Sequence, residues 1–289
     1  MFSHLELLVR MPSTSSDIQR VALTIAGSDS GGGAGIQTDL KAFHQLGVFG
    51  TSAITAITAQ NPFGVRSVQP VDAQIVGDQI DTVLEAFTIG AVKTGMLFNA
   101  DIVECVADSL SRLEIPVVVD PVMVATSGAV LLQDDAVGAL KSKLLPRATL
   151  ITPNLPEASL LLGRKIAADF AGDAASELAE AFGCGVLVKG GHDENGKSSV
   201  DWLATTDGKI QGVKTPRVEA ATTHGTGCAL SAAIAAGLAK GLNLTDAVIQ
   251  AKAYIYGNLC NCRRVGENTF AMNPVQELPL DAVEVESTF

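Results

Sequence analysis

The residues of this chain with the clearest chemical potential lie in the segment Thr223 to Cys228, where a glycine-punctuated turn leads into a helix of small residues. Backbone N–H groups at a helix start have no intrahelical acceptor, and the helix dipole adds partial positive charge, so such a junction suits an anion. A helix N-terminus also lowers the pKa of a nearby thiol, which makes Cys228 a candidate proton acceptor. An anion site beside a proton acceptor predicts phosphoryl transfer. The alternative is that Cys228 only fills a crowded helix start, as free cysteines usually do.

A phosphoryl-transfer site needs a scaffold, and the chain alternates strand-like and helical segments. The strand candidates are residues 21–26, 51–58, 91–94, 117–120, 149–151 and 186–189, and the helix candidates are 36–46, 72–87, 100–113, 136–144 and 174–182. This alternation predicts an α/β fold with one mostly parallel sheet and helices on both faces. A later segment, 201–213, predicts a hairpin around Asp207-Gly208 that covers one end of the nucleotide site.

The domain organisation follows from the same pattern, because no Gly/Ser-rich or Pro-rich linker interrupts it. We expect a single domain over residues 19–264. Residues 1–18 are expected to form a loose N-terminal extension. Residues 265–289 form an acidic tail that contains prolines, and we expect it to be poorly ordered.

Charged residues follow several of the predicted strands, and the active groups of such a sheet collect at the carboxyl ends of its strands. Asp120 closes the fourth strand, and Asn154 and Glu157 follow the fifth. Mg²⁺ takes one or two carboxylates and leaves its other positions to phosphate oxygens, so Asp120 and Glu157 are candidate metal ligands. For Glu157 the alternative is an ordinary carboxylate at a helix N-terminus. Lys189, which leaves the sixth strand, is placed to neutralise a triphosphate.

A second group of candidates surrounds the glycine-rich segment 27–35, which matches neither a dinucleotide fingerprint nor a Walker A loop. Its glycines favour close approach of a ligand to the backbone. Asp39 is expected to be a solvated or capping carboxylate unless a ligand donates to it. The Gln60 amide can pair with an aminopyrimidine edge, and Met96 can pack on a flat ring, although a loop amide and a core methionine are the ordinary interpretations. His224 has no Asp or Ser partner at a recognisable spacing, so we interpret it as structural.

Composition excludes several classes of function. The chain has 289 residues, 47% of them hydrophobic, which is enough for one large α/β core. A net charge of −11 argues against a nucleic-acid partner and against an anionic membrane surface. No apolar run reaches membrane-spanning length. The five cysteines are scattered, without metal-finger spacing, which favours the cytoplasm.

Taken together, these segments resemble the hydroxymethylpyrimidine/phosphomethylpyrimidine kinases of thiamine biosynthesis, in the ribokinase-like superfamily. Each matching string is weakly specific alone, but all of them follow one another in family order over residues 20–262. They are residues 24–29, 32–39, 55–61, 93–97, 120–123, 152–157, 189–192 and 223–228.

The resemblance implies a fold and a reaction. The fold would be a single-domain, ribokinase-like, three-layer αβα sandwich. ATP, with Mg²⁺, would phosphorylate 4-amino-5-hydroxymethyl-2-methylpyrimidine to its phosphate and then to the diphosphate. For the second step, the glycine-rich segment 27–35 is a candidate for accommodating the first phosphate. The resemblance also implies a homodimer.

The resemblance further implies a division of labour among residues. The pyrimidine pocket would consist of Gly27, Asp39, Gln60, Met96 and Val122. Mg²⁺ and phosphate would be held by Asp120, Asn154 and Glu157, and the nucleotide phosphates by Lys189, Asn154, Thr226 and Lys252. The anion hole would be formed by Gly225, Thr226, Gly227 and Cys228. Cys228 stands where most ribokinase-like enzymes carry an aspartate base.

Two other functions compete with this interpretation. A pyridoxal kinase of the same superfamily would act on a similar hydroxymethyl-bearing ring, but the Gln60 amide is the better match to an aminopyrimidine. A non-catalytic ligand-sensing protein on the same fold is the second alternative. It is disfavoured because four charged or reactive groups are intact, namely Asp120, Glu157, Lys189 and Cys228.

Overall fold

The computed structural model describes residues 19–123, 132–192, 196–219 and 224–288. The predicted N-terminal extension, 1–18, and Thr223 of the anion-binding segment lie outside the described residues. Ten strands of the described chain form one sheet, in the order β12-β9-β8-β7-β6-β5-β4-β1-β2-β3. They are β1 (Val21–Asp29), β2 (Phe49–Asn61), β3 (Gly64–Pro70), β4 (Ile89–Thr94), β5 (Val117–Val119), β6 (Leu150–Ile151), β7 (Gly185–His192), β8 (Ser198–Ala204), β9 (Ile210–Pro216) and β12 (Glu284–Thr288).

The middle of the sheet is parallel and its two edges are antiparallel. Strands β2, β1, β4, β5, β6 and β7 form the parallel part. At one edge β3 pairs antiparallel with β2, and at the other β8, β9 and β12 are antiparallel additions. The predicted mostly parallel α/β sheet is confirmed. A short second sheet pairs β10 (Arg263–Arg264) with β11 (Phe270–Ala271).

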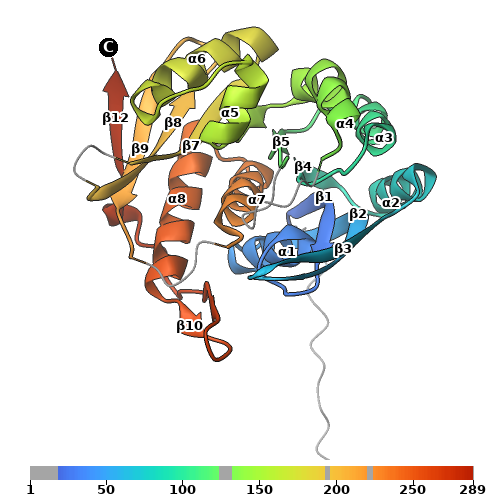
Figure 1. Ribbon diagram of the computed structural model, residues 1–289, viewed down its shortest axis with the longest axis horizontal. Coiled ribbons are helices and arrows are strands. Elements are labelled where there is room, and N and C mark those ends of the chain that lie inside the picture. Colours follow the sequence, from blue (N-terminus) through green and yellow to red (C-terminus); the bar gives the residue numbers. More distant parts are fainter. Residues whose placement is uncertain (1–18, 124–131, 193–195, 220–223, 289) are drawn as a thin grey trace, which may run out of the picture.

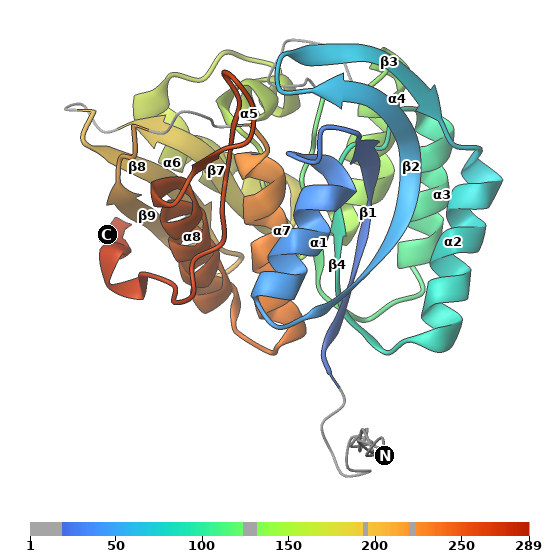
Figure 2. The same cartoon turned by 90° about the horizontal axis from the view of Figure 1, so that it is seen from below.

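Helices cover both faces of the sheet, as Figures 1 and 2 show. On one face lie α1 (Gly35–Gln45), α7 (Thr226–Ala239) and α8 (Leu244–Cys260). On the other lie α2 (Ala73–Ala86), α3 (Ala100–Leu110), α4 (Asp134–Ala139), α5 (Leu155–Leu162) and α6 (Ala171–Phe182). A π-helix (Leu140–Leu144) and 3₁₀ turns (Leu145–Arg147, Ala168–Phe170 and Leu280–Ala282) complete the described elements. Among the described residues, no helix combines the length and the apolar character needed to cross a membrane.

Helix α7 occupies the centre of its layer, and its composition explains why. Every residue from Ala229 to Ala239 is buried, because the helix packs against β4, α1 and α8. Its small side chains permit close backbone approach, and a Cβ on Gly237 would lie 2.9 Å from the Cβ of Ala247. The surrounding core therefore fixes where α7 begins, at the carboxyl ends of the central strands.

The acidic tail departs from the expectation that it is poorly ordered. It ends in β12, whose residues Glu284 to Thr288 pair with Lys214 to Ile210 of β9. The Lys214 ammonium also forms ion pairs with Glu284, at 3.1 Å, and with Glu286. The backbone ladder and these charges hold an otherwise polar segment on the sheet. The predicted hairpin at 201–213 is the strand pair β8–β9 within the same sheet.

Candidate active site

A cavity of about 830 Å³ opens at the carboxyl ends of the central strands, beside the N-terminus of α7. All of the predicted site residues except Asp39 line it. Those lining residues are Gly27, Gln60, Met96, Asp120, Val122, Asn154, Glu157, Lys189, Gly225, Thr226, Gly227, Cys228 and Lys252. The strand order thus brings together residues that are up to 225 positions apart in the sequence, from Gly27 to Lys252.

One end of the cavity is apolar and is built around Met96. A Cβ on Gly27 would lie 2.6 Å from Met96 Cε, so a side chain at this position would push the end of the methionine aside. Val122 packs into the same small apolar cluster. The Gln60 backbone is tied to Ser30, whose Oγ donates to Gln60 O at 2.7 Å and accepts from Gln60 N at 2.8 Å. This end therefore combines apolar side chains with a glutamine whose backbone is anchored.

Asp39 lies beneath the cavity wall, and its neighbour Lys93 reaches the wall instead. The Asp39 side chain is fully buried, so it is neither the solvated nor the exposed capping carboxylate expected from the sequence. Its Oδ2 accepts from Lys93 Nζ at 2.7 Å and from Thr24 Oγ1 at 2.6 Å. Burial alone would lower the pKa of Lys93, but attraction to the carboxylates of Asp39 and Asp120 raises it, so the ammonium stays charged. Lys93 was not predicted as a site residue, since a lysine inside an apolar strand has no sequence pattern that identifies its partner.

Cys228 stands at the first turn of α7, as predicted, but its thiol is not acidic. Burial raises the pKa of Cys228 to about 11, and the Lys93 ammonium only partly opposes that rise. The neutral thiol is therefore the main form at pH 7. The expectation that the helix start lowers this pKa is wrong, because removing the thiol from water outweighs the favourable charges around it.

The opposite end of the cavity carries carboxylates and a lysine. Lys189 Nζ lies 2.6 Å from Asp120 Oδ1, and Asp120 is almost fully buried. Asp120 also accepts from Thr152 Oγ1 at 3.2 Å and from Ser231 Oγ at 3.3 Å. Burial raises the pKa of Glu157 to about 7, with Lys189 opposing the rise and Asp120 adding to it. Negative charge is thus concentrated where phosphates and a cation would meet.

Asn154 and Glu157 form a capping box at the start of α5. Asn154 Oδ1 accepts from Glu157 N at 2.8 Å, and Glu157 Oε2 accepts from Asn154 N at 2.8 Å. The alternative interpretation of Glu157, as a carboxylate at a helix N-terminus, is therefore confirmed. Because a carboxylate has several lone pairs, this hydrogen bond leaves other lone pairs of Glu157 for a ligand in the cavity.

The residues present suit Mg²⁺. Asp120 and Glu157 offer the hard oxygen ligands that this ion prefers, and both face one cavity. Burial is the main cause of the raised pKa of Glu157, and repulsion from Asp120, which a bound cation would relieve, adds to it. Within the described ranges, no group of three or more His, Cys, Asp or Glu side chains gathers. Mg²⁺ needs no such cage when phosphate oxygens and water fill its other positions.

Lys252 reaches the cavity from α8 and is held by Asp201. Lys252 Nζ lies 2.7 Å from Asp201 Oδ2 and 3.2 Å from Ser199 Oγ. Asp201 Oδ1 also accepts from Gly190 N at 2.8 Å, at the turn after Lys189. Sequence reasoning did not identify Asp201, although alternation in a half-buried strand is the signal that would have pointed it inward.

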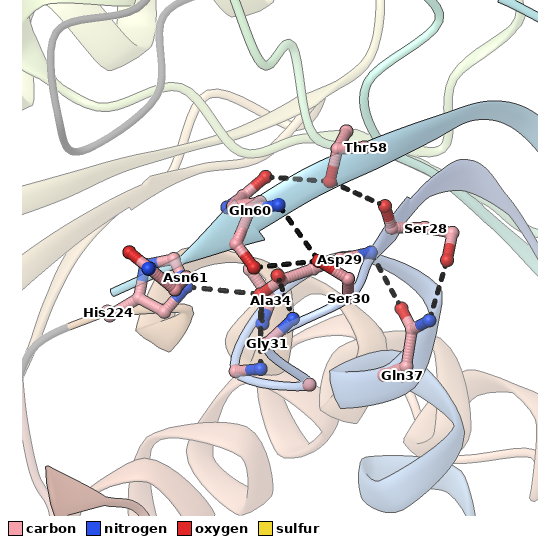
Figure 3. Close-up of polar contacts among 12 residues, drawn as sticks. Ser28, Asp29, Ser30, Gly31, Ala34, Gln37, Thr58, Gln60, Asn61 and His224 are labelled. Carbon is pink, nitrogen blue, oxygen red and sulfur yellow. Dashed lines mark hydrogen bonds and ion pairs between the residues drawn. The ribbon is translucent and has the colours of Figure 1, made fainter. Parts of the chain in front are cut away.

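The glycine-rich turn after β1 is folded around the carboxylate of Asp29 (Figure 3). Asp29 Oδ1 accepts from Gly31 N at 2.8 Å, and Oδ2 accepts from Gly33 N at 3.1 Å and Ala34 N at 2.8 Å. The predicted role of this turn in accommodating a phosphate is therefore not supported, since an internal anion already occupies these N–H groups. Sequence reasoning did not identify Asp29.

His224 has the acidic partner that its sequence spacing did not reveal. Its Nε2 lies 3.2 Å from Asp29 Oδ2, across 195 positions of sequence (Figure 3). Burial alone would raise the pKa of Asp29, but hydrogen bonds from His224, Gly31 and Ala34 lower it. The carboxylate is therefore ionised at neutral pH and accepts every one of these bonds.

Solved structures place this architecture among the small-molecule kinases with a ribokinase-like fold. The Staphylococcus aureus pyridoxal kinase in complex with AMP-PCP and pyridoxal superposes with a TM-score of 0.80 at 30% identity, covering 93% of this chain and 99% of that one. The phosphomethylpyrimidine kinase of Clostridium difficile superposes with a TM-score of 0.71 at 40% identity, covering 82% and 98%.

Sequence relatives narrow this class to one family. The family model described as phosphomethylpyrimidine kinase matches residues 29–273. A hydroxymethylpyrimidine/phosphomethylpyrimidine kinase of Rhizobium meliloti is 51% identical, over 85% of this chain and 92% of that protein. The protein of the same name from Haemophilus influenzae is 47% identical, over 87% and 95%. The chain belongs to the phosphomethylpyrimidine kinase family.

Proposed function

We propose that this chain transfers the γ-phosphoryl group of ATP to 4-amino-5-hydroxymethyl-2-methylpyrimidine, and then phosphorylates the monophosphate, in thiamine biosynthesis. The observation that carries the proposal is the arrangement of one cavity. By the strand order, Gln60 on β2 and Lys189 on β7 come from opposite sides of this cavity, and Met96, the two carboxylates and the start of α7 also line it. The names of the relatives agree with this substrate.

In the proposed mechanism, Gly27, Met96 and Val122 hold the ring, and Gln60 pairs with its amino-bearing edge. The substrate hydroxyl then faces Cys228 and the backbone N–H groups of 225–228. The oxygen–phosphorus bond to the hydroxyl forms as the bond from Pγ to the ADP oxygen breaks. Phosphoryl transfer needs positioning and charge neutralisation more than covalent help from the protein. Asp39 contributes through Lys93 rather than by contact with the substrate.

Charge on the transferred group is met by several groups of the chain. The N–H groups at the start of α7 face the phosphoryl oxygens, and Lys189, Thr226 and Lys252 face the nucleotide phosphates together with Asn154. Mg²⁺, when bound to Asp120 and Glu157, supplies further neutralisation of phosphate charge. Cys228 accepts the hydroxyl proton as a thiolate, which forms when the thiol releases its own proton to water in the cavity and which the Lys93 ammonium stabilises.

The substrate is tested by comparing ATP consumption with the hydroxymethylpyrimidine, its phosphate and pyridoxal. We expect turnover with both pyrimidines and weaker turnover with pyridoxal. Strongest turnover with pyridoxal would favour the pyridoxal kinase alternative, for which the similarity to pyridoxal kinase structures is the supporting observation. No turnover with any of them, together with measurable pyrimidine binding, would favour a ligand-sensing protein.

The role of Cys228 is tested by substitution. We expect Cys228→Ala to lower kcat by about 100-fold or more, the usual contribution of a positioned proton acceptor. Cys260→Ser is the matched control, because Cys260 is an exposed thiol at the far end of α8. If Cys228→Ala kept kcat within about threefold of the wild type, the assignment as base would be wrong and the cysteine would only fill space.

We also propose a homodimer in the cytoplasm. All five cysteines lie in described segments and are free thiols, which supports a reducing compartment. Phe63, in the turn between β2 and the edge strand β3, is 70% exposed, which supports burial of this turn by a second copy. Analytical ultracentrifugation of wild type and Phe63→Ser tests the dimer, and a monomeric wild type would contradict it.

A further inference from the structure

The carboxylate of Asp29 connects two loops that come from distant parts of the sequence (Figure 3). It binds the glycine-rich turn through the N–H groups of Gly31, Gly33 and Ala34. It also binds His224, the residue directly before the anion-hole segment 225–228. Asp29 is only 2% exposed, so water competes little for these bonds. We call this set, Asp29, the turn 31–34 and His224, the Asp29 clasp.

The two loops of the clasp are also in direct backbone contact. A Cβ on Gly225 would lie 1.7 Å from Gly33 O, and a Cβ on Gly33 would lie 2.6 Å from His224 Cδ2. A side chain at position 225 would therefore collide with the backbone of the turn, and one at position 33 would displace the His224 ring. The start of α7 cannot move towards the turn, and the bond from Asp29 to His224 opposes its movement away.

The chemistry of the pair fixes which atom donates. An ionised carboxylate only accepts hydrogen bonds, so Nε2 of His224 carries the hydrogen in this contact. Asp29 Oδ2 collects three donors, from Gly33 N, Ala34 N and His224 Nε2. An amide at position 29 would supply a single accepting oxygen and could not reproduce this pattern.

The same turn holds the substrate end of the cavity. Ser30, next to Asp29, exchanges two hydrogen bonds with the backbone of Gln60. One short segment, residues 29–34, is thus bonded to Gln60 on one side and to His224 on the other. The distance between the proposed pyrimidine-binding amide and the proposed anion hole depends on this segment.

We propose that Asp29 and His224 are positioning residues, whose hydrogen bond holds the anion-hole segment 225–228 in line with a substrate bound at Gln60. This inference rests on the function proposed above. Neither side chain needs to contact the reacting atoms. A displacement of about 1 Å between reacting groups can lower a rate by about 100-fold, so a small loosening of the clasp would be visible in kcat.

The test is a set of steady-state measurements on His224→Ala, His224→Gln, Asp29→Asn and the double variant His224→Ala/Asp29→Asn. We expect His224→Ala to lower kcat by about 10- to 100-fold, with the KM values for ATP and pyrimidine changing by less than about threefold. His224→Gln should recover most of kcat, because a glutamine Nε2 can donate from nearly the same place. The double variant should be no slower than the slower single variant, since both remove one shared bond.

Lys41→Met is the matched control. Lys41 Nζ donates to Gly32 O at 2.6 Å, so it holds the same turn from the outside without touching His224. We expect wild-type kcat for this variant and melting temperatures for the His224 variants close to that of the control.

Three results would overturn the clasp. They are multiplicative losses in the double variant, a loss confined to KM, or His224→Gln as slow as His224→Ala. A wild type that turns over none of the substrates would defeat the proposed function and the clasp together. An active wild type with His224→Ala equal to Lys41→Met would defeat the clasp alone.

Discussion

At the scale of single residues, the buried ion pair of Lys93 and Asp39 explains how a charged group can stand beneath an apolar cavity end. Both side chains are fully buried and 2.7 Å apart, and Thr24 supplies a further bond to Asp39. Removing one partner would leave an uncompensated charge, which is far more costly than removing both. Lys93 and Cys228 face the same cavity, so the pair sets the potential at the thiol.

This potential can be read from the reactivity of Cys228. Because the pKa of Cys228 is raised to about 11, alkylation of Cys228 by iodoacetamide should rise about tenfold per pH unit between pH 7 and 10. The neutral double variant Lys93→Met/Asp39→Asn should be slower than wild type at each pH, since the stabilising cation is lost. Mass spectrometry of the peptide that contains Cys228 follows the reaction.

The control for that measurement is Lys41→Met, which removes an exposed lysine away from the thiol. It should leave the pH profile of Cys228 unchanged. A profile that levels off near pH 8 in the wild type would show that the thiol is acidic after all. Equal rates in wild type and the double variant would show that Lys93 does not act on Cys228.

At the scale of elements, the start of α7 depends on one backbone conformation. Gly225 has φ +77°, and a Cβ there would collide with Gly33 O. Gly241, just after the other end of α7, has φ +87° with nothing within 4 Å of its hypothetical Cβ. The two glycines thus have the same backbone preference and differ only in their surroundings.

Substituting each glycine by alanine separates the cost of a left-handed backbone conformation from the cost of the steric collision. Gly241→Ala should lower the free energy of unfolding by about 1–2 kcal/mol, the cost of a left-handed conformation for an L-residue. Gly225→Ala should lower the free energy of unfolding clearly more than Gly241→Ala does. It should also lower kcat, because the anion hole must shift to relieve the collision. Urea unfolding and steady-state kinetics measure the two effects. Equal free energies of unfolding for the two variants would mean that the loops at Gly225 and Gly33 move apart at little cost.

The same scale shows what could be predicted from sequence. Buried parallel strands such as β1 and β4 read as continuous apolar runs, so their existence and their converging ends followed directly. The edge strands β3 and β12 escaped prediction, because a polar strand is stabilised by its neighbour rather than by its own pattern. Because these strand ends converge, the cavity residues that follow them could be predicted from the sequence. The side chains that hydrogen-bond to those residues could not. The bond from Asp29 to His224 depends on two loops that only the finished topology brings together.

At the scale of the whole molecule, β12 closes one edge of the sheet without contributing to the cavity. Its five residues pair with β9, where Val213 is fully buried. Among the described side chains of β12, those of residues 284–287, none lines the cavity. Stability and catalysis should therefore separate when this strand is removed.

Deleting residues 284–289 should lower the melting temperature by about 2–6 °C, as expected if one to two kcal/mol is lost from a domain of this size. The kcat of the folded fraction should stay near the wild-type value. The new open edge of β9 should also promote association, which size-exclusion chromatography would detect. Lys214→Gln, which removes the ion pairs and keeps the backbone ladder, should melt closer to the wild type than the deletion does. A deletion that loses kcat in step with stability would show that the edge strand and the cavity are coupled, and that the tail is part of the catalytic unit.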